Sequence, residues 1–481
     1  MTPIPPPDIN WLAVVPSGLL VLTAILVLFW DLWIQEEDRP HLVWLTISGF
    51  VLTGAVSFGL WGQADASGPL ALDSYALFFN GIFCLAGVLT VLMSGSYLDL
   101  TKIRQGEYYA LLLFAAVGMV LMAAATDLIT IFLGLETMSI AVYVLTGIWH
   151  QRLASNEAAL KYFLLGAFAS GFLLYGMALI YGVTGSLQLA VIAEQVAAQG
   201  SSPLLLVGMG LLLVGFGFKV AAAPFHVWTP DVYEGSPTTI TAFMVVGVKA
   251  AAFAAFARVF LYALAAVHAE WQGVVWVIAV LTMTVGNLTA LVQTNIKRML
   301  AYSSVAHAGY VLVAMVAGKE LGGAAMMYYL VAYGFMNLGA FGVVLSLNRQ
   351  DQPNEELRDY AGLGFRYPAL GMAMAIFMLS LTGVPPLVGF TGKFYVFSAA
   401  VEAGYIGLAV IGVLNSAVSA YYYIRVIVTM YMEEGDAGFE IAALRPALSA
   451  AIIIAAAGTV LLGIFPSASI SIARESFLSL G

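Results

Sequence analysis

Charged residues are scarce in this chain. Only 9% of its 481 residues are Asp, Glu, Lys or Arg, whereas 62% are hydrophobic. A soluble domain has about 25% charged and about 45–50% apolar residues. The composition therefore excludes an ordinary soluble domain and indicates a protein that crosses a membrane many times. The net charge of −9, without any basic patch, also excludes a nucleic-acid-binding protein.

Cysteine is almost absent as well. The single cysteine, Cys84, lies in an apolar run. One cysteine cannot form a disulfide within the chain, a CxxC redox site or an iron–sulfur ligand set. The sequence also lacks the HExxH, phosphate-loop and dinucleotide-binding glycine motifs. We therefore expect this chain itself to bind no cofactor and no metal, so its chemistry must depend on its few charged residues.

Long apolar runs separated by short polar breaks predict an all-α polytopic membrane protein with about 14 transmembrane helices. The runs are too long, and alternate too little, for the strands of a membrane barrel, which need about 10 residues. The predicted spans are residues 11–34, 41–62, 74–97, 108–125, 128–149, 157–182, 203–233, 237–260, 273–293, 298–317, 323–347, 368–403, 405–431 and 446–465.

Two of these spans exceed the roughly 20 residues of a straight crossing and contain proline. Span seven holds Pro224, and span twelve holds Pro385 and Pro386. Proline removes a helical hydrogen bond and clashes with the preceding turn, so each span should break there. Broken helices at matching positions of two repeats mark the ion path in transporters. The alternative is a proline kink with no role in transport.

The two broken spans are five spans apart, and an odd offset places two copies in opposite orientations across the membrane. We therefore predict an inverted repeat of spans 4–8 and spans 9–13. The expected division is 1–105 with spans 1–3, 106–262 for the first repeat, 263–433 for the second and 434–481 with span 14.

The basic residues predict the orientation. Loops after even-numbered spans, with the C-terminal tail, hold only Lys319 and Arg474, and Arg258 and Arg425 fall near span ends, where they can reach the interface. Because cytoplasmic loops are enriched in Lys and Arg, we expect both termini on the periplasmic side of a bacterial inner membrane. The basic residues after odd-numbered spans are Arg39, Lys102, Arg104, Arg152, Lys297, Arg298, Arg349, Arg358, Arg366 and Arg445.

Four lysines and one acid are left inside the predicted spans: Lys161, Lys219, Lys249, Lys393 and Glu136. At about 1.5 Å per residue, Lys249 lies roughly 18 Å and Glu136 roughly 12 Å into an apolar core of about 30 Å. Burial disfavours a charged lysine, whereas a nearby carboxylate favours it, as a proton carrier requires. Glu136 and Lys219 would pair if spans five and seven touch. The alternative is an ion pair that only locks helices together.

Two histidines are further candidates. His226, just after Pro224, could relay protons between Lys219 and Lys249, and His307 in span ten could link the two halves. For each, the alternative is a hydrogen-bonded histidine that serves only packing.

Three stretches carry a resemblance to a known family. They are GFKVAAAPFHVWTPDVYEGSPT at 217–238, NIKRMLAYSS at 295–304 and GVPPLVGFTGKF at 383–394. They resemble the signatures of the antiporter-like membrane subunits of complex I, the proton-pumping NADH:quinone oxidoreductase, over essentially all 14 spans. The M-type branch carries a glutamate where Lys393 stands. Lys393 and the sequence at 226–234 therefore favour the N-type branch, the counterpart of mitochondrial subunit 2.

The resemblance implies a proton-translocating subunit. Glu136 would modulate Lys219, Lys219 would load the proton, Lys249 would lead to the centre, and Lys393 would exchange protons with the outside. Lys161 would be a further member of the chain. The parent complex would hold FMN, iron–sulfur clusters and quinone.

The partners that the resemblance implies are a sister antiporter-like subunit, small membrane subunits and the lipid bilayer. Two alternatives remain open: a subunit of a multi-subunit Na⁺/H⁺ antiporter, and a structural membrane scaffold within the same complex.

Overall fold

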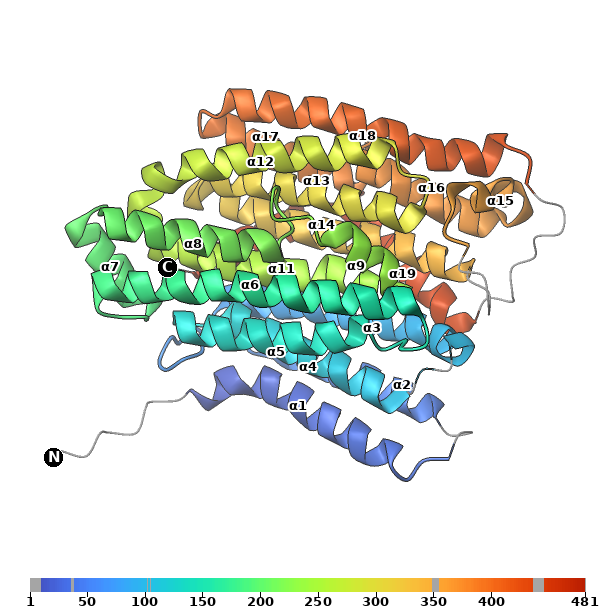
Figure 1. The fold of residues 1–481 in the computed structure, drawn as a ribbon, viewed down its shortest axis with the longest axis horizontal. Coiled ribbons are helices and arrows are strands. Elements are labelled where there is room, and N and C mark those ends of the chain that lie inside the picture. The colour runs from blue at the N-terminus through green and yellow to red at the C-terminus, as the bar shows by residue number, and fades with distance from the viewer. Residues whose placement is uncertain are drawn as a thin grey trace.

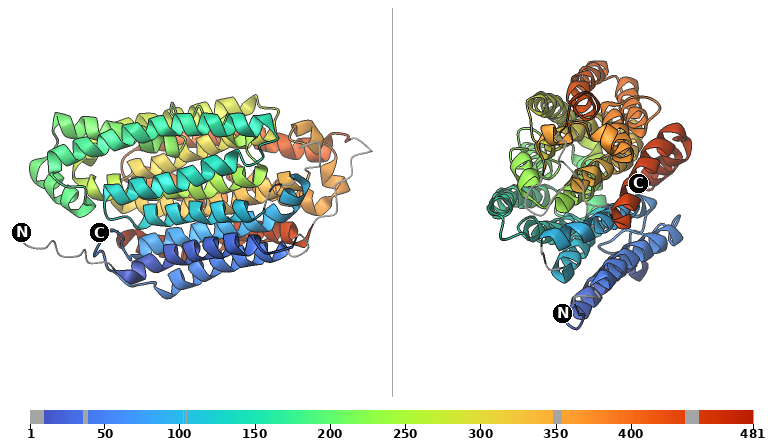
Figure 2. Two further views of the ribbon diagram at one scale, coloured as in Figure 1. Left: turned by 60° about the horizontal axis from the view of Figure 1, so that its bottom comes forward. Right: turned by 90° about the vertical axis from the view of Figure 1, so that its right-hand side faces the viewer.

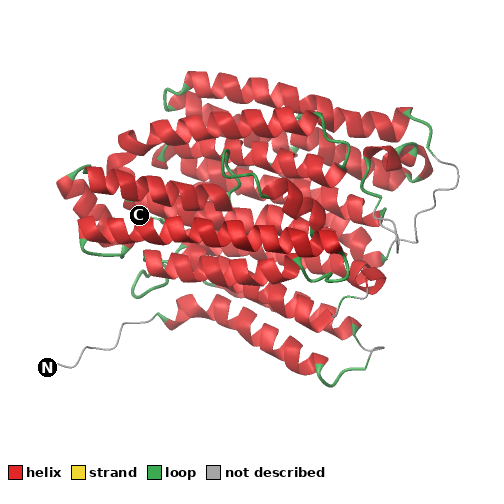
Figure 3. Cartoon of the chain, viewed as in Figure 1, coloured by secondary structure: helices red, strands yellow, loops and turns green. Residues whose placement is uncertain are grey.

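The computed structural model describes residues 10–35, 39–101, 103, 105–347, 354–435 and 445–480. Within these ranges the chain consists of helices and connecting loops, with no strand beyond isolated bridges (Figure 3). The predicted all-α class is therefore confirmed. Three basic residues that were used to predict the orientation, Lys102, Arg104 and Arg349, lie outside the described residues.

Twelve helical rods in the described ranges are long and apolar enough to cross a membrane. One of these helical rods, at 238–263, consists of four consecutive pieces. They are α10 (Thr238–Phe243), a π-helical turn at Met244–Val248, α11 (Lys249–Ala257) and a second π-helical turn at Arg258–Ala263. The others are α1 (Trp11–Asp31), α2 (Pro40–Gly59), α3 (Ser74–Thr101), α4 (Gln105–Ala124), α5 (Leu128–Thr146), α6 (Leu153–Thr184), α12 (His268–Leu291), α13 (Ile296–Val316), α14 (Lys319–Ser346), α18 (Ile406–Met432) and α19 (Pro446–Ile464).

Both predicted breaks are present and complete the 14 predicted spans. Span seven consists of α8 (Pro203–Lys219) and α9 (Thr229–Gly235), and span twelve consists of α16 (Pro368–Thr382) and α17 (Val388–Glu402). The predicted prolines lie between the halves, and each break contains a cis X–Pro peptide bond.

Side chains satisfy the backbone groups that the breaks set free. At the first break, Trp228 Nε1 donates to the carbonyl oxygen of Phe218 at 3.1 Å, and the Ala223 amide donates to Thr282 Oγ1 at 2.9 Å. At the second, Gly383 ends α16 with a φ of 96°, a left-handed value that glycine adopts without a steric penalty. Non-helical backbone at membrane depth is tolerated when protein groups satisfy it in this way.

Shorter helices lie between or after the spans. They include α7 (Leu189–Gln199), which buries Leu189, Ile192 and Val196 on one face and follows α6 where the sequence predicted only a connection. The remaining short elements are the turns Ala265–Val267 and Leu357–Tyr360, α15 (Leu363–Arg366) and α20 (Ser467–Leu478).

The spans run side by side, with α1 and α2 at one edge and α17 and α18 at the opposite edge (Figures 1 and 2). The start of α1 and the C-terminal end of the chain lie at the same end of the bundle (Figure 1). The centre is formed by the rod at 238–263, buried throughout its most apolar stretch, and by α13 and α14, buried over 94% and 89% of theirs. The central rods therefore have little surface for lipid.

Arg258 is not at an interface, contrary to the prediction. Its side chain is buried, and Nη2 contacts both carboxylate oxygens of Asp73 at 2.7 and 2.8 Å. Nε donates to the carbonyl oxygen of Ala123 at 2.5 Å, and Asp73 also accepts from the Ala76 amide at the start of α3. This ion pair, beside a cavity of about 400 Å³, joins α3 and α4 to the central rod.

Removing one partner of this pair should leave the other charge buried and unpaired. We expect Asp73→Ala to destabilise the protein by about 3–5 kcal/mol, because the buried guanidinium loses its carboxylate. The thermal unfolding midpoint of the purified protein measures the loss. The double variant Asp73→Ala/Arg258→Met should recover part of it, and a double variant less stable than Asp73→Ala would contradict this role for the pair.

Candidate functional site

Lys219 is the last residue of α8, and its side chain is buried against α5. Its Nζ donates to Ser139 Oγ at 2.7 Å and to Tyr143 Oη at 3.1 Å. Three aromatic rings have their centroids 5.3–5.8 Å from Nζ, close enough for cation–π attraction: Tyr143, Tyr162 and Phe218. The ammonium group is thus held by hydroxyl oxygens and ring faces.

Glu136 does not form the direct pair with Lys219 that the sequence predicted. No salt bridge joins them in the described structure, and Glu136, half-buried, accepts a hydrogen bond from Ser170 Oγ of α6. Glu136 and Ser139 are three residues apart, so they share a face of α5 about 4.5 Å apart along its axis. The serine that accepts from the Lys219 ammonium group is therefore one helical turn from Glu136 on α5.

Lys249 begins α11 directly after a π-helical turn, and its side chain is buried, as predicted. Its Nζ donates to the carbonyl oxygen of Ser304 at 2.6 Å and to Ser304 Oγ at 3.0 Å. Ser304 belongs to α13, so this lysine connects two of the most buried rods of the bundle.

His307 lies on α13 between tyrosines of α14 and α18. Its Nδ1 is 2.8 Å from Tyr329 Oη, and its Nε2 is 3.1 Å from Tyr423 Oη. The Tyr423 hydroxyl also forms a hydrogen bond with Ser303, the neighbour of the serine that holds Lys249. One short stretch of α13 thus carries polar contacts from Lys249 to His307.

Lys393 of α17 is buried against the end of α16. Its Nζ donates to the carbonyl oxygens of Leu381 and Thr382 at 2.8 and 2.9 Å, and to Ser416 Oγ of α18 at 2.8 Å. The two carbonyl groups lie at the C-terminus of α16, where the break leaves them without helical partners. The Tyr310 ring lies 4.9 Å from Nζ. Lys393 therefore ties together the two halves of the broken helix.

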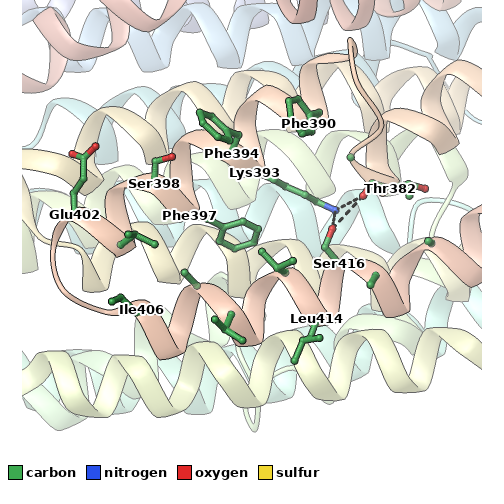
Figure 4. A pocket seen from close by; sticks show the side chains of 17 residues that line it. Thr382, Phe390, Lys393, Phe394, Phe397, Ser398, Glu402, Ile406, Leu414 and Ser416 are labelled. Carbon is green, nitrogen blue, oxygen red and sulfur yellow. Dashed lines mark hydrogen bonds between the residues drawn. The ribbon is translucent and has the colours of Figure 1, made fainter.

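A cavity of about 790 Å³ between α17 and α18 reaches Lys393 (Figure 4). Its walls are mainly apolar, with Phe390, Phe394 and Phe397 on α17. The ammonium group and Ser416 lie toward one end of this cavity, and Glu402 lies at the other (Figure 4). Lys393 is thus buried in the bundle yet borders an open space.

Two predicted candidates are placed differently. Lys161 is not buried: its side chain is 42% exposed and pairs with Glu157 at 2.7 Å and Asp231 at 2.8 Å. His226 is half-buried, and its Nδ1 has no hydrogen-bond partner among the described residues. In this part of the chain no hydrogen bond links His226 to Lys219 or Lys249, so the predicted relay is not assembled here.

A charged network that the sequence did not reveal joins α9 to α13. Arg298 Nη1 contacts Asp231 at 2.8 Å and Glu234 at 2.6 Å. Lys297, fully buried, donates to the backbone carbonyl of Glu234 at 2.9 Å and to the Glu355 carboxylate at 3.2 Å. Both basic residues were predicted to mark a loop. The available signal was the acid pair Asp231 and Glu234 within 217–238 and the basic pair Lys297 and Arg298 within 295–304.

The lysines fall into two chemical classes. Lys219, Lys249 and Lys393 donate hydrogen bonds to hydroxyl and carbonyl oxygens and lie near aromatic rings, with no salt bridge in the described residues. Lys161 and Lys297 pair with carboxylates. A neutral lysine of the first class would leave no unpaired carboxylate behind, whereas a neutral lysine of the second class would. Over the same residues, no group of His, Cys, Asp and Glu could hold a metal ion.

The two carboxylate-paired lysines provide a matched test of this division. We expect Lys297→Met to cost about 3–5 kcal/mol, because it strands a buried carboxylate. Lys161→Met should cost about 1 kcal/mol or less, because the pair is exposed. Thermal unfolding of each variant measures the difference. Equal losses would refute the assignment of Lys297 as a structural residue.

Known proteins resemble this chain over its full length. Residues 125–419, which include both breaks, match the family described as NADH:quinone oxidoreductase/Mrp antiporter, TM. NADH-quinone oxidoreductase subunit N of Trichlorobacter lovleyi is 51% identical over 472 residues, covering 97% of each chain.

Solved structures share the fold. A chain of respiratory complex I from Thermus thermophilus, solved with bound aureothin, is 36% identical, with a TM-score of 0.83 over 96% of this chain and 100% of its own. A chain of the Mrp complex from Dietzia sp. has a TM-score of 0.81 over 97% of both chains at 20% identity, which shows the fold alone.

Proposed function

The chain belongs to the NADH:quinone oxidoreductase/Mrp antiporter membrane family, and we propose that it is the N-type, proton-translocating membrane subunit of a bacterial complex I. The observation that carries this proposal is the set of three buried lysines that have uncharged partners and no salt bridge in the described residues, two of them at helix breaks. The 51% identity to a subunit N supports the N-type assignment.

The proposed path runs along the helices that carry these lysines. Lys219 takes up the proton at the first break, and Lys249 holds it at the centre. The serines and tyrosines around His307 lead toward the second half, where Lys393 exchanges the proton at the second break. Neighbouring residues of α13 support this order. Ser304 accepts from Lys249, and Ser303 and His307 both form hydrogen bonds with Tyr423 of α18.

The proposed driving force is electrostatic. Glu136 lies one turn from Ser139, so its negative charge stabilises the Lys219 ammonium without a direct bond. A charge change in a neighbouring subunit that weakens the stabilisation of the Lys219 ammonium group by Glu136 would release the proton toward Lys249. Moving one charge against 100 mV costs about 2.3 kcal/mol. Because about 1.4 kcal/mol corresponds to a tenfold change in an equilibrium constant, the required change in proton affinity is less than a hundredfold.

The redox chemistry is assigned to partner subunits. We propose that FMN, iron–sulfur clusters and quinone are bound elsewhere in the complex. We propose that this chain contacts a sister antiporter-like subunit, small membrane subunits and lipid. A bacterial inner membrane with both termini on the periplasmic side agrees with the basic loops and with the chain ends at one end of the bundle.

The proposed inverted repeat, 106–262 and 263–433, is supported by matching local structure. Asp127 caps α5 by accepting from the Thr130 amide, and Asn295 caps α13 in the same way. Asp127 bridges Gln188, and Asn295 bridges Glu356. Both members of the second bridge lie 168 positions after those of the first, so the two halves share a register here.

Two variants test the function in the assembled complex, purified through a tag on this chain. Lys219→Ala should remove this subunit's share of the protons pumped per NADH oxidised, and Glu136→Gln should reduce that share in part. Electron transfer in uncoupled membranes should persist. Proton uptake by reconstituted vesicles measures the effect, with Lys161→Ala as the matched lysine control.

The same preparation separates the alternatives. A Na⁺/H⁺ antiporter subunit would co-purify without flavin and iron–sulfur partners. A structural scaffold would leave pumping unchanged in Lys219→Ala while the complex assembles fully. Either result would refute the proposed function.

A further inference from the structure

Two tyrosines lie at similar depth on α5 and α13, one residue apart in the register that the two bridges define. Tyr143 begins the tripeptide Tyr-Val-Leu at 143–145, and Tyr310 begins the same tripeptide at 310–312. Tyr143 is the sixteenth residue of α5, and Tyr310 is the fifteenth residue of α13. Each contacts the buried lysine beside a helix break: Lys219 in one half and Lys393 in the other. The pairing of a tyrosine with a lysine therefore recurs in both halves.

The two tyrosines touch their lysines with different atoms. Tyr143 Oη accepts a hydrogen bond from Lys219 Nζ at 3.1 Å. Tyr310 presents its ring face, with the centroid 4.9 Å from Lys393 Nζ. The Tyr310 hydroxyl is occupied elsewhere, because it accepts from Asn287 Nδ2 at 3.3 Å. Tyr143 thus adds a hydrogen bond to a ring contact at 5.3 Å, whereas Tyr310 contacts its lysine through the ring.

A glycine on α6 makes room for the Tyr143 hydroxyl. A Cβ atom added at Gly166 would collide with Tyr143 Oη. Any larger residue at position 166 would therefore displace the hydroxyl or push α6 away from α5. The glycine leaves space for the oxygen that accepts from Lys219.

We propose that Tyr143 and Tyr310 are positioning residues that stabilise the ammonium forms of Lys219 and Lys393, Tyr143 through its hydroxyl and Tyr310 through its ring. This inference rests on the proposed proton-translocating function. A hydrogen-bond acceptor and a π face both favour a cation over a neutral amine. Each tyrosine therefore sets the proton affinity of its lysine.

The test compares Phe and Leu at each position. Proton pumping by the reconstituted complex is measured against pH for Tyr143→Phe, Tyr143→Leu, Tyr310→Phe and Tyr310→Leu. Tyr143→Phe removes the acceptor and should move the alkaline limb of the profile about one pH unit lower, a tenfold change in proton concentration. It should give at least half of the shift of Tyr143→Leu. Because Tyr310→Phe keeps the ring, it should give less than half of the shift of Tyr310→Leu.

Two further variants guard against a merely structural effect. Gly166→Ala leaves every hydroxyl in the chain but displaces that of Tyr143, so its profile should shift in the same direction as that of Tyr143→Phe. Tyr109→Phe removes another buried hydroxyl, which has no hydrogen-bond partner among the described residues. It is the matched control, and its profile should coincide with that of the unmodified complex.

Lys219→Ala in the same assay distinguishes failure of the proposed function from failure of the proposed role of the tyrosines. If Lys219→Ala pumps normally, the proposed function fails, and this inference fails with it. If Lys219→Ala loses pumping but Tyr143→Phe leaves the profile in place, the inference alone is overturned. Equal shifts for Phe and Leu at position 310 would also overturn it, because they would assign the contact to the hydroxyl.

Discussion

Three ammonium groups inside the bundle are held by uncharged oxygens and aromatic rings, and none has a carboxylate partner among the described residues. The rest of the structure depends on this arrangement. A charge at mid-membrane costs about 2.5–3.5 kcal/mol on insertion scales, so each lysine needs acceptors. Carboxylates would supply them, but a lysine that loses its proton would then leave a buried anion behind. Hydroxyl and carbonyl oxygens hold the cation and remain uncharged when it is gone. Lys219, Lys249 and Lys393 all have such partners.

The helix breaks supply part of this environment. At Lys393 the acceptors are backbone carbonyls that an intact helix would use internally. At Lys219 the break ends α8 at the lysine itself, so the ammonium group reaches the hydroxyls of α5. The breaks are therefore part of the site. Lys249 lies instead between two of the most buried helices, at 238–263 and 296–316, which leave little surface for lipid.

Ion pairs lie around the uncharged surroundings of the three lysines. Arg298 with its two acids holds α9 against α13, and Asp73 with Arg258 holds α3 against the central rod. These pairs fix the rods between which the lysines lie. Among the described residues, Lys219, Lys249 and Lys393 are thus the buried basic side chains of Lys and Arg without a carboxylate partner.

Hydropathy and proline predicted the spans and both breaks, because these features are local. Pairing was harder to predict. Arg258 looked interfacial because its partner, Asp73, is 185 residues away. Lys161 looked buried because it falls inside a predicted span, but its side chain is exposed and pairs with Glu157 one turn earlier and with Asp231 on α9. The tyrosines around the site could not be distinguished from core aromatic residues, since their hydroxyl partners lie on other helices.

The central claim is that the buried lysines conduct protons, and Lys249 tests it most directly, because its hydrogen bonds in the described structure go to the neutral Ser304. The deciding measurement is the number of protons pumped per NADH oxidised by the reconstituted, fully assembled complex that carries Lys249→Met. The account predicts a lower ratio than in the unmodified complex, with electron transfer retained in uncoupled vesicles. An unchanged ratio would contradict it.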